Sequence, residues 1–463
     1  EDRPLQFAGV RTDKNFNVIS EPLVHYCRPS PDCLLHPAAI RVTGISPYKA
    51  LAEGAHEGAF MAKIQREFMV PGTCALGYNS VRFDDEITRF ALYRNFFPPY
   101  AREFGQNRSR WDLIDVARAV YALRPDGIVW PTREDGLPSF RLEDLTAANG
   151  IDHGNAHDAL ADVLATIALA KLLSKAQPTL FDTLYAQRGK QAIAPLLNCL
   201  DPKPVIHVSG QFGAQRDNLA IVLPLAVHPT NKNGVICADL GEAPAFLDQS
   251  SEDVRRLLFT PKADFPAGVQ RPPLKMIQIN RAPVVLPTTW VSGEPAQRLR
   301  LDGDQTRASL AAYRGARQAD PKGFTRFIEE IYADRAFAPR SDPDTQLYEG
   351  FLGRHDEALL ETIRQATPDS LASHTWTFED RRLPEVFFRY RARNFPESLD
   401  PDENARWREH CRETLKGKAG PDWEGFSKQL NEERAREGLS VMQIAALDDL
   451  EQYTRELRAE LAD

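Results

Sequence analysis

Two short segments carry side chains that could act together on a phosphodiester. The first, GYNSVRFDDE (77–86), places Asp84 directly after the apolar run TCALGYN (73–79). The second, NAHDALAD (155–162), puts His157 and Asp162 in the first turns of a predicted helix. A carboxylate can hold a divalent metal ion, and an imidazole can take a proton from a metal-bound water. The two segments therefore indicate metal-assisted hydrolysis.

Each of these residues also has a simpler explanation. An Asp after a strand often only caps the following helix. At a position like that of Asp84, such capping is about as frequent as a catalytic role. A single His at a helix start is more often a surface or capping residue than a base. Asp158 and Asp162 lie one turn apart, so spacing alone does not say which of them would be a ligand. Neither segment decides the function by itself.

The elements that would position these residues alternate between strands and helices. We expect strands at QFAGVRTD (6–13), FNVISEPLVHYC (16–27) and TCALGYN, the last of them buried. Helical spacing recurs through the rest of this region, at 55–68, 87–97, 111–123, 140–151 and 156–173. Such alternation is typical of an α/β layer architecture, and it would bring the end of 73–79 to the sheet edge where α/β enzymes place their sites.

The pattern changes twice further along the chain. Stretches rich in Val and Ile, such as AIVLPLAVHP (220–229) and LKMIQINRAPVVLP (274–287), alternate with Gly, Pro and Asn, and Asn233-Gly234 is a hairpin signal. This predicts a β-rich domain. After the linker-like APRSDPDT (338–345), long amphipathic segments such as HDEALLETIRQA (355–366) predict an all-helical domain. The predicted domains are 1–177, 178–335 and 338–463.

Composition narrows the class of protein. A chain of 463 residues needs two or three cores, and we find no apolar run long enough for a membrane span and no signal peptide at its beginning. Its six cysteines are scattered without a CxxC pair, which favours reduced thiols in a cytosolic protein over structural zinc or disulfides. The net charge of −8 excludes a generally basic protein, but an enzyme that binds a strand in one groove needs only a basic groove.

The two motifs together resemble those of a known superfamily. Asn-x-x-x-Phe-Asp (79–84) followed by His-x-x-x-x-Asp (157–162) is similar to the second and third motifs of the DEDDh exonucleases, which share a ribonuclease H-like fold. AIRVTGIS (39–46) resembles their segment that lies against the terminal nucleotide. Within the superfamily, DGLPSFRLEDLTAANGI (135–151) and YRARNFP (390–396) closely resemble the bacterial exonuclease I family. That family joins an exonuclease domain, an SH3-like β-barrel and a helical C-terminal domain, which matches the two pattern changes.

The resemblance assigns roles to individual residues. It makes Asp84 the second-motif carboxylate, which supports a metal ion, and His157 the general base. It selects Asp162 rather than Asp158 as the third-motif metal ligand, and makes Arg141 a substrate-binding arginine. The family's first motif, Asp-x-Glu, is expected upstream of EDRPLQFAGVRT, with which this chain begins. Without the Asp and the Glu of that motif, the Mg²⁺ ions would lack two of their four acidic ligands. Because Mg²⁺ needs near-octahedral oxygen coordination, we expect the polypeptide as printed to be inactive.

A processive exonuclease also needs cations and aromatic rings along the strand, which hold DNA without reading its sequence. A single surface Lys or Arg is by default only a solvated charge. The candidates therefore depend on the resemblance or on proximity to the motifs, and they are Thr43, Arg89, Tyr100, Arg118, Lys190, Lys203, Asn233, Lys275 and Asn280.

The resemblance implies a function and its partners. It implies processive 3′→5′ hydrolysis of single-stranded DNA to nucleoside 5′-monophosphates, with two Mg²⁺ ions that Mn²⁺ can replace, in DNA repair and recombination. It further implies binding to the acidic tail of single-stranded DNA-binding protein, and a monomer in the bacterial cytoplasm.

Two other functions remain open at this point. One is a DEDDh exonuclease that acts on short RNA or as a proofreading subunit, although such enzymes are usually compact single domains. The other is a single-stranded-DNA-binding protein with a decayed active site. A comparison of DNA and RNA hydrolysis would test the first alternative, and the sequence upstream of Glu1 would test the second.

Overall fold

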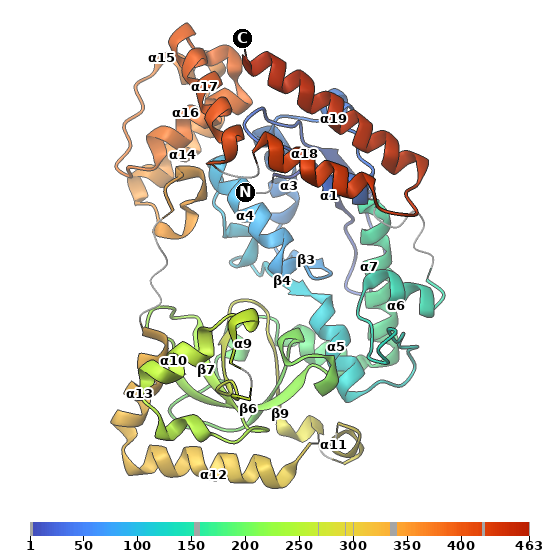
Figure 1. Ribbon diagram of the computed structural model, residues 1–463, viewed down its shortest axis with the longest axis vertical. Coiled ribbons are helices and arrows are strands. Elements are labelled where there is room, and N and C mark those ends of the chain that lie inside the picture. Colours follow the sequence, from blue (N-terminus) through green and yellow to red (C-terminus); the bar gives the residue numbers. More distant parts are fainter. Residues whose placement is uncertain are drawn as a thin grey trace.

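A computed structural model describes residues 3–151, 158–266, 268–291, 293–299, 301–333, 340–418 and 422–462. The chain forms three units, the N-terminal unit (3–186), the middle unit (190–333) and the C-terminal unit (340–462). The N-terminal unit lies between the other two, with the middle unit at the bottom of Figure 1 and the long C-terminal helices at the top. Both other units therefore contact the unit that carries the two motifs.

The N-terminal unit combines two small sheets with helices. Strands β1 (Gln6–Gly9) and β2 (Leu23–Tyr26) pair antiparallel, and β3 (Cys74–Gly77) and β4 (Ser109–Asp112) pair parallel. The predicted strands are thus shorter than expected, and β3 is half-buried rather than buried. The helices of this unit are α1 (Pro37–Thr43), α2 (Pro47–Glu53), α3 (Glu57–Phe68), α4 (Asp84–Arg94), α5 (Leu113–Leu123), α6 (Leu142–Ala148), α7 (Ala159–Ala176) and α8 (Pro178–Ala186).

Helix α5 shows how the sequence determines these elements. Asp112 caps its N-terminus, and apolar residues recur at a helical spacing. Leu113, Val116, Val120 and Leu123 are at most 1% exposed, so one face of α5 is fully buried. They join the same cluster as Leu180 of α8 and, from the middle unit, Ile206, Val208 and Leu286. One continuous apolar core therefore joins the N-terminal and middle units.

The middle unit is built on a five-stranded antiparallel sheet with the strand order β8-β7-β6-β5-β9. Its strands are β5 (Val205–Val208), β6 (Leu219–Val227), β7 (Gly234–Asp239), β8 (Leu274–Gln278) and β9 (Val284–Pro287). Gly234, of the predicted hairpin dipeptide, is the first residue of β7, and its amide donates to the Asn231 carbonyl oxygen at 2.8 Å.

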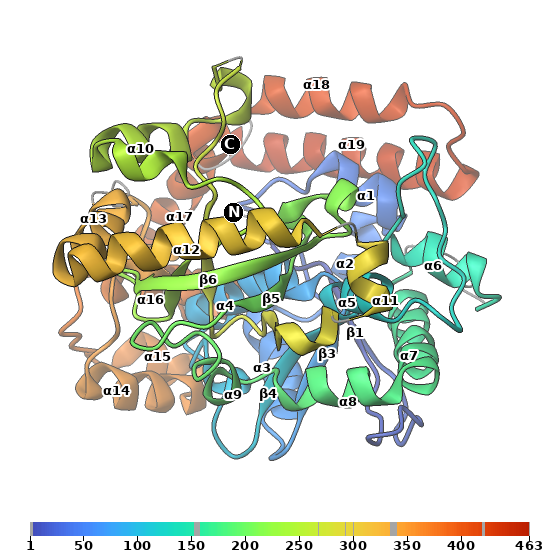
Figure 2. The ribbon, with the colours of Figure 1, turned by 90° about the horizontal axis from the view of Figure 1, so that it is seen from below.

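The middle unit also contains helices that the β-rich prediction omitted. They are α9 (Lys190–Ile193), α10 (Ser251–Phe259), α11 (Glu294–Arg298), α12 (Gly303–Ala319) and α13 (Pro321–Ala333). Helix α12 covers the outer side of the unit in both views (Figures 1 and 2). Phe324 and Ile328 of α13 pack against Leu223 and Ile236 of the sheet. The strand patterns in the sequence therefore predicted the sheet of this unit but not its helices.

The C-terminal unit is helical, as the sequence predicted. It consists of α14 (Arg354–Gln365), α15 (Pro368–Ser373), α16 (Leu383–Asn394), α17 (Pro401–Glu413), α18 (Trp423–Arg434) and α19 (Val441–Ala462). Helices α18 and α19 lie against α1, where Ile40 shares a core with Leu430, Leu447 and Leu450. The last two helices of the C-terminal unit thus pack against the N-terminal unit through α1.

All six cysteines are free thiols.

Within the described ranges, no helix combines the length and the apolar character that crossing a bilayer would require.

Candidate active site

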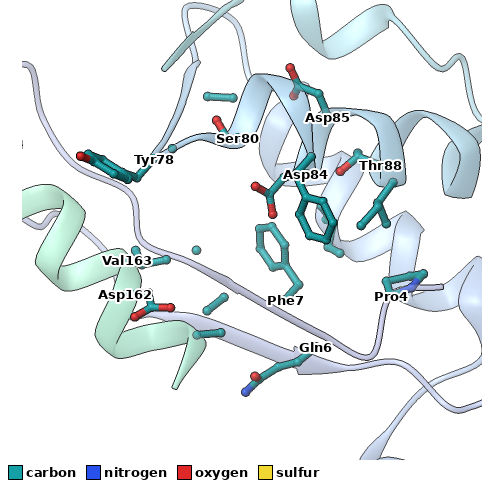
Figure 3. A pocket seen from close by; sticks show the side chains of 18 of the residues that line it. Pro4, Gln6, Phe7, Tyr78, Ser80, Asp84, Asp85, Thr88, Asp162 and Val163 are labelled. Carbon is teal, nitrogen blue, oxygen red and sulfur yellow. The ribbon is translucent and has the colours of Figure 1, made fainter. Parts of the chain in front are cut away.

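The two motif segments open onto one large cavity of about 2200 Å³. Asp84 of α4 and Asp162 of α7 both line it, although 78 positions separate them in the chain. Figure 3 shows their side chains on two sides of the cavity, with Phe7 of β1 between them in that view. Arg141 and Thr43, both predicted to contact substrate, line the same cavity. The fold thus brings together side chains from four separate segments.

Asp84 reaches the cavity through a short turn after β3. The strand ends at Gly77, a 3₁₀ turn follows at Ser80–Arg82, and Phe83 occupies the N-cap position of α4. Asp84 is therefore the first residue of the helix and not its cap. The carboxylate is open to the cavity. Loss of water to the surrounding protein, together with the neighbouring Asp85 and Asp112, raises its pKa to about 6.

Asp85 has a different environment. Its carboxylate is buried and accepts hydrogen bonds from Arg102 and Arg110, whose guanidinium groups lower its pKa although burial alone would raise it. Both oxygens of Asp85 are thus engaged inside the protein. Asp84 is the carboxylate of this pair that can meet a ligand in the cavity.

Helix α7 separates its two acidic residues in a similar way. The Asp158 carboxylate caps the helix and accepts hydrogen bonds from the amides of Leu160 and Ala161 at 3.0 and 3.1 Å. Asp162 lies one turn further, half-buried in the cavity wall. This arrangement favours Asp162 over Asp158 as a ligand. His157 lies outside the described residues, so its predicted role as the base stays a prediction.

Comparison with known proteins identifies the family of this architecture. Residues 1–170 match the family model described as "Exonuclease", residues 188–334 the "Exonuclease I SH3-like domain", and residues 341–457 the "Exonuclease I C-terminal domain". The chain belongs to the exonuclease I family. The fold is accordingly a ribonuclease H-like exonuclease domain, an SH3-like domain and a C-terminal domain, as the sequence predicted.

Individual relatives cover nearly the whole chain. Exodeoxyribonuclease I of Escherichia coli strain K12 is 45% identical over 458 residues, which are 98% of this chain and 94% of the relative. The zinc-bound form of an E. coli exonuclease I–single-stranded DNA complex matches with a TM-score of 0.91 at 44% identity, over 98% of this chain and 96% of that one. An SSB/exonuclease I structure with an inhibitor matches with a TM-score of 0.89 at 42% identity and the same coverage.

An exonuclease domain depends on a divalent metal ion, and the described side chains fit such an ion. Asp84 and Asp162 offer only carboxylate oxygens, the donors that hard cations such as Mg²⁺ prefer. The described residues contain no cluster of three or more His, Cys, Asp or Glu that could hold a metal ion. Asp84 and Asp162 would therefore supply only part of the coordination sphere.

The predicted DNA contacts of the exonuclease domain lie in different environments. Thr43 lines the cavity, where its hydroxyl donates to the Ala39 carbonyl oxygen at 2.9 Å. The Arg141 side chain is 73% exposed, which leaves it accessible to a substrate. Arg118 pairs with Asp115 at 2.7 Å, so its guanidinium has only part of its hydrogen-bonding capacity left.

Arg89 and Tyr100 form a more internal pair. Arg89 is 4% exposed and donates to both oxygens of Glu103 at 2.7 and 2.9 Å. Its guanidinium also lies over the Tyr100 ring, 5.5 Å from the ring centroid. This burial favours a packing role for Arg89 over a direct DNA contact. Tyr100 packs at the edge of the core that α4 shares with α14 and α16.

In the SH3-like domain, the predicted contacts divide into exposed and buried groups. Lys190 and Asn233 are exposed or half-buried and bind each other, with the Lys190 Nζ 2.6 Å from the Asn233 Oδ1. Lys203 and Asn280 are exposed as well. Lys275 differs, because burial lowers its pKa to about 7. Its Nζ has no hydrogen-bond partner among the described residues and lies 4.1 Å from the centroid of the Phe212 ring.

Two residues that shape the site, Phe7 and Asp112, were not predicted from the sequence. Phe7 lines the cavity and packs edge-on against Phe68, with 5.9 Å between ring centroids. Its place in the strand predicted at 6–13 was the only signal for it. Asp112 lies behind the cavity, where its carboxylate binds the turn before Asp84. Nothing in the spacing of SRWDLID linked it to that turn.

Proposed function

We propose that this chain removes nucleotides from the 3′ end of single-stranded DNA and releases nucleoside 5′-monophosphates. The observation that carries the proposal is that Asp84 and Asp162, from two distant motifs, open onto one cavity with Arg141 and Thr43. The E. coli relative of 45% identity is an exodeoxyribonuclease I, and exonuclease I has been crystallised with single-stranded DNA. Both support DNA as the substrate.

The proposed site uses two Mg²⁺ ions, with Mn²⁺ as a working substitute. Asp162 would hold the cations together with the family's first-motif carboxylates, and Asp84 would support them through water. Bound cations would neutralise charge on the scissile phosphate and make a water molecule more acidic. The open carboxylate of Asp84 and the half-buried carboxylate of Asp162 support this assignment.

The chain's own residues would carry out the remaining steps. His157 would take a proton from the attacking water, which prepares it to attack the phosphorus atom. The leaving group is the 3′ oxygen of the next nucleotide, so the phosphate stays on the released nucleotide as its 5′-phosphate. Arg141, exposed at the cavity rim, would bind the terminal nucleotide through a phosphate oxygen.

The strand would leave the cavity along the interface between the exonuclease and SH3-like domains. Lys190, Lys203, Asn233, Lys275 and Asn280 come from the SH3-like side of this path, while Arg118 and Tyr100 come from the exonuclease side. Enclosure of the strand by three domains is the physical basis that we propose for processivity. The ring of Tyr100 would stack with a base, and the cations would bind phosphates.

The proposed partners follow from the same function. An SSB/exonuclease I structure supports binding to single-stranded DNA-binding protein. We place the chain, as a monomer, in the cytoplasm of a bacterium, where it would act in DNA repair and recombination on strands that this partner coats.

One assay tests the central claim. Oligonucleotides of one sequence, as DNA and as RNA and labelled at either end, would be incubated with Mg²⁺ or with EDTA. The protein in this and the other activity tests carries the first-motif segment expected upstream of Glu1. We expect 3′-labelled DNA to lose its label at once as a mononucleotide, and 5′-labelled DNA to shorten from the far end, in Mg²⁺ only. Preference for RNA would favour the RNA-directed alternative, and binding without cleavage would favour a DNA-binding protein.

The histidine requires a separate test. His157→Ala should lower kcat by about 10²- to 10⁴-fold while leaving DNA affinity nearly intact, since removing a general base affects the chemical step. An equal loss of binding would indicate that the histidine has a structural role instead.

A further inference from the structure

The carboxylate of Asp112 binds three backbone amides from two separate segments. Oδ1 accepts from the amides of Asn79 at 2.7 Å and Ile114 at 3.1 Å, and Oδ2 accepts from the amide of Val81 at 3.1 Å. Asp112 is the last residue of β4 and the N-cap of α5, and it is buried. It does not line the cavity, so any effect on catalysis must act through other residues.

The turn that Asp112 binds is irregular. Asn79 has a φ of 58°, in the left-handed region that non-glycine residues rarely adopt, and Phe83 has φ −123° and ψ −71°. Such conformations persist only where the surroundings enforce them. Between β3 and α4, regular strand or helix pairing does not supply the partners of the Asn79 and Val81 amides. The Asp112 carboxylate supplies them instead.

This arrangement exceeds what a helix cap requires. Asp302 is an ordinary cap, because it accepts from Gln305 of its own helix α12 at 2.9 Å. Asp112 needs only the Ile114 amide to cap α5. Its two other hydrogen bonds reach 33 and 31 positions back along the chain. They join the end of β4 to the turn that delivers Asp84.

We propose that Asp112 is a positioning residue of the nuclease site, whose carboxylate fixes the turn at 79–83 so that Asp84 faces the cavity. The inference rests on the proposed function, in which Asp84 supports the cations. Gly77 contributes to the same geometry, because a Cβ there would lie 2.5 Å from Ser80. The turn is therefore tight at its start and bound to Asp112 along its middle.

Asp112→Ser separates positioning from capping. Serine is a good N-cap and keeps the Ile114 bond, but its side chain is too short to reach Asn79 and Val81. We expect kcat on a 5′-labelled single-stranded oligonucleotide to fall about tenfold or more, since small misplacements of catalytic groups are costly, while KM stays within about twofold. Asp302→Ser, the matched cap variant, should keep the kcat of the parent chain.

A second readout does not depend on activity. Hydrogen–deuterium exchange should accelerate in the peptide that contains Asn79 and Val81 in Asp112→Ser, with little change in the peptide that begins α5. Asp112→Asn should show an intermediate exchange rate and kcat. Its Oδ1 can still accept from Asn79 and Ile114, whereas its Nδ2 faces the Val81 amide and cannot accept from it.

Each outcome has a defined meaning. Exchange as slow as in the parent chain, or faster exchange with an unchanged kcat, would overturn the positioning role. If Asp112→Ser does not fold, the same criteria apply to Asp112→Asn. If the parent protein, with the first-motif segment upstream of Glu1, releases no nucleotides from DNA in Mg²⁺, the proposed function fails instead. The exchange experiment still decides whether Asp112 holds the turn.

Discussion

The hydroxyl of Tyr78 donates a hydrogen bond of 2.6 Å to the backbone carbonyl oxygen of Phe140. Tyr78 directly follows β3, and Phe140 directly precedes Arg141, the N-cap residue of α6. Both rings line the cavity. The strand that leads to Asp84 is thus tied, over 62 positions of sequence, to the backbone that carries the predicted substrate-binding arginine.

We therefore expect Tyr78→Phe to weaken substrate binding. A hydrogen bond of this kind contributes about 1 kcal/mol, so kcat/KM on single-stranded DNA should fall about fivefold, mainly through KM. The control is Tyr313→Phe, since the buried Tyr313 hydroxyl has no hydrogen-bond partner among the described residues. That variant should keep both kinetic constants. Steady-state kinetics on one oligonucleotide would decide, and an unchanged KM in Tyr78→Phe would contradict the link to Arg141.

The adjacent carboxylates Asp84 and Asp85 should respond to substitution in opposite ways. Asp84→Asn should lower kcat at least about a hundredfold, because a bound cation contributes several kcal/mol to the transition state, and should leave the thermal unfolding temperature almost unchanged. Asp85→Asn should cost about 3–5 kcal/mol of stability, because the buried Arg102 and Arg110 lose their shared anion. Calorimetry and kinetics on both variants test this. Similar effects in both would refute the assignment of Asp84 to the cavity.

Much of the fold follows from apolar periodicity, and the exceptions have physical causes. Helices such as α3 and α5 were predictable because their buried faces repeat at helical spacing. Helix α12 was missed because its face towards the core is narrow. Only Ser309 and Tyr313 are buried along its 17 residues, and Leu310 and Ala316 are partly buried. Trp111 and Asp112, the last residues of strand β4, were predicted as the start of the helix at 111–123, because no turn separates β4 from α5.

The candidate site was predictable only where a motif keeps its residues close in sequence. Asp84 and Asp162 could be named from their motifs, and the structure brings them to one cavity. The choice between Asp84 and Asp85 depends on Arg102 and Arg110, which lie 17 and 25 positions from Asp85. No local pattern encodes such a partner. The same limitation concealed Asp112, whose role depends on contacts with a distant turn.

Buried charges also join the exonuclease and C-terminal domains, and spacing did not predict them. Arg393 of α16 is 6% exposed and bonds to Asp32 at 2.6 Å and to Asp344. Arg3 binds the same Asp32 at 3.0 Å. These cations hold the pKa of Asp32 well below its usual range although burial opposes this. The two domains thus share a compensated ionic cluster.

Arg393→Met should destabilise the protein strongly. The change removes the cation that the buried carboxylates of Asp32 and Asp344 share. Its loss should lower the free energy of unfolding by about 3–5 kcal/mol. Arg455→Met removes an exposed arginine that pairs with Glu451 on α19 and should cost at most about 1 kcal/mol. Denaturant unfolding of both variants measures the difference. Equal midpoints would show that the buried cluster contributes no more than a surface pair.

A buried histidine in the SH3-like domain should make stability depend on pH. His207 is 4% exposed, and its Nδ1 lies 2.8 Å from the Val284 carbonyl oxygen of β9. Burial, together with the charge of the nearby Lys275, lowers its pKa to about 3. The unfolded chain, with a histidine pKa of about 6.5, therefore binds a proton that the folded chain does not. His207 consequently favours the folded state fully above about pH 6.5, and this contribution declines as the pH falls towards 3.

The expected slope is about 1.4 kcal/mol per pH unit between these two pKa values. We expect His207→Asn, whose side-chain amide can donate to Val284, to lose stability less steeply than the parent chain on going from pH 7 to pH 5. The control is His374→Asn, which changes an exposed histidine and should keep the parent slope. Urea unfolding at several pH values gives the slopes. If His207→Asn and the parent chain show parallel pH profiles, the pKa of His207 in the folded domain must equal that in the unfolded chain.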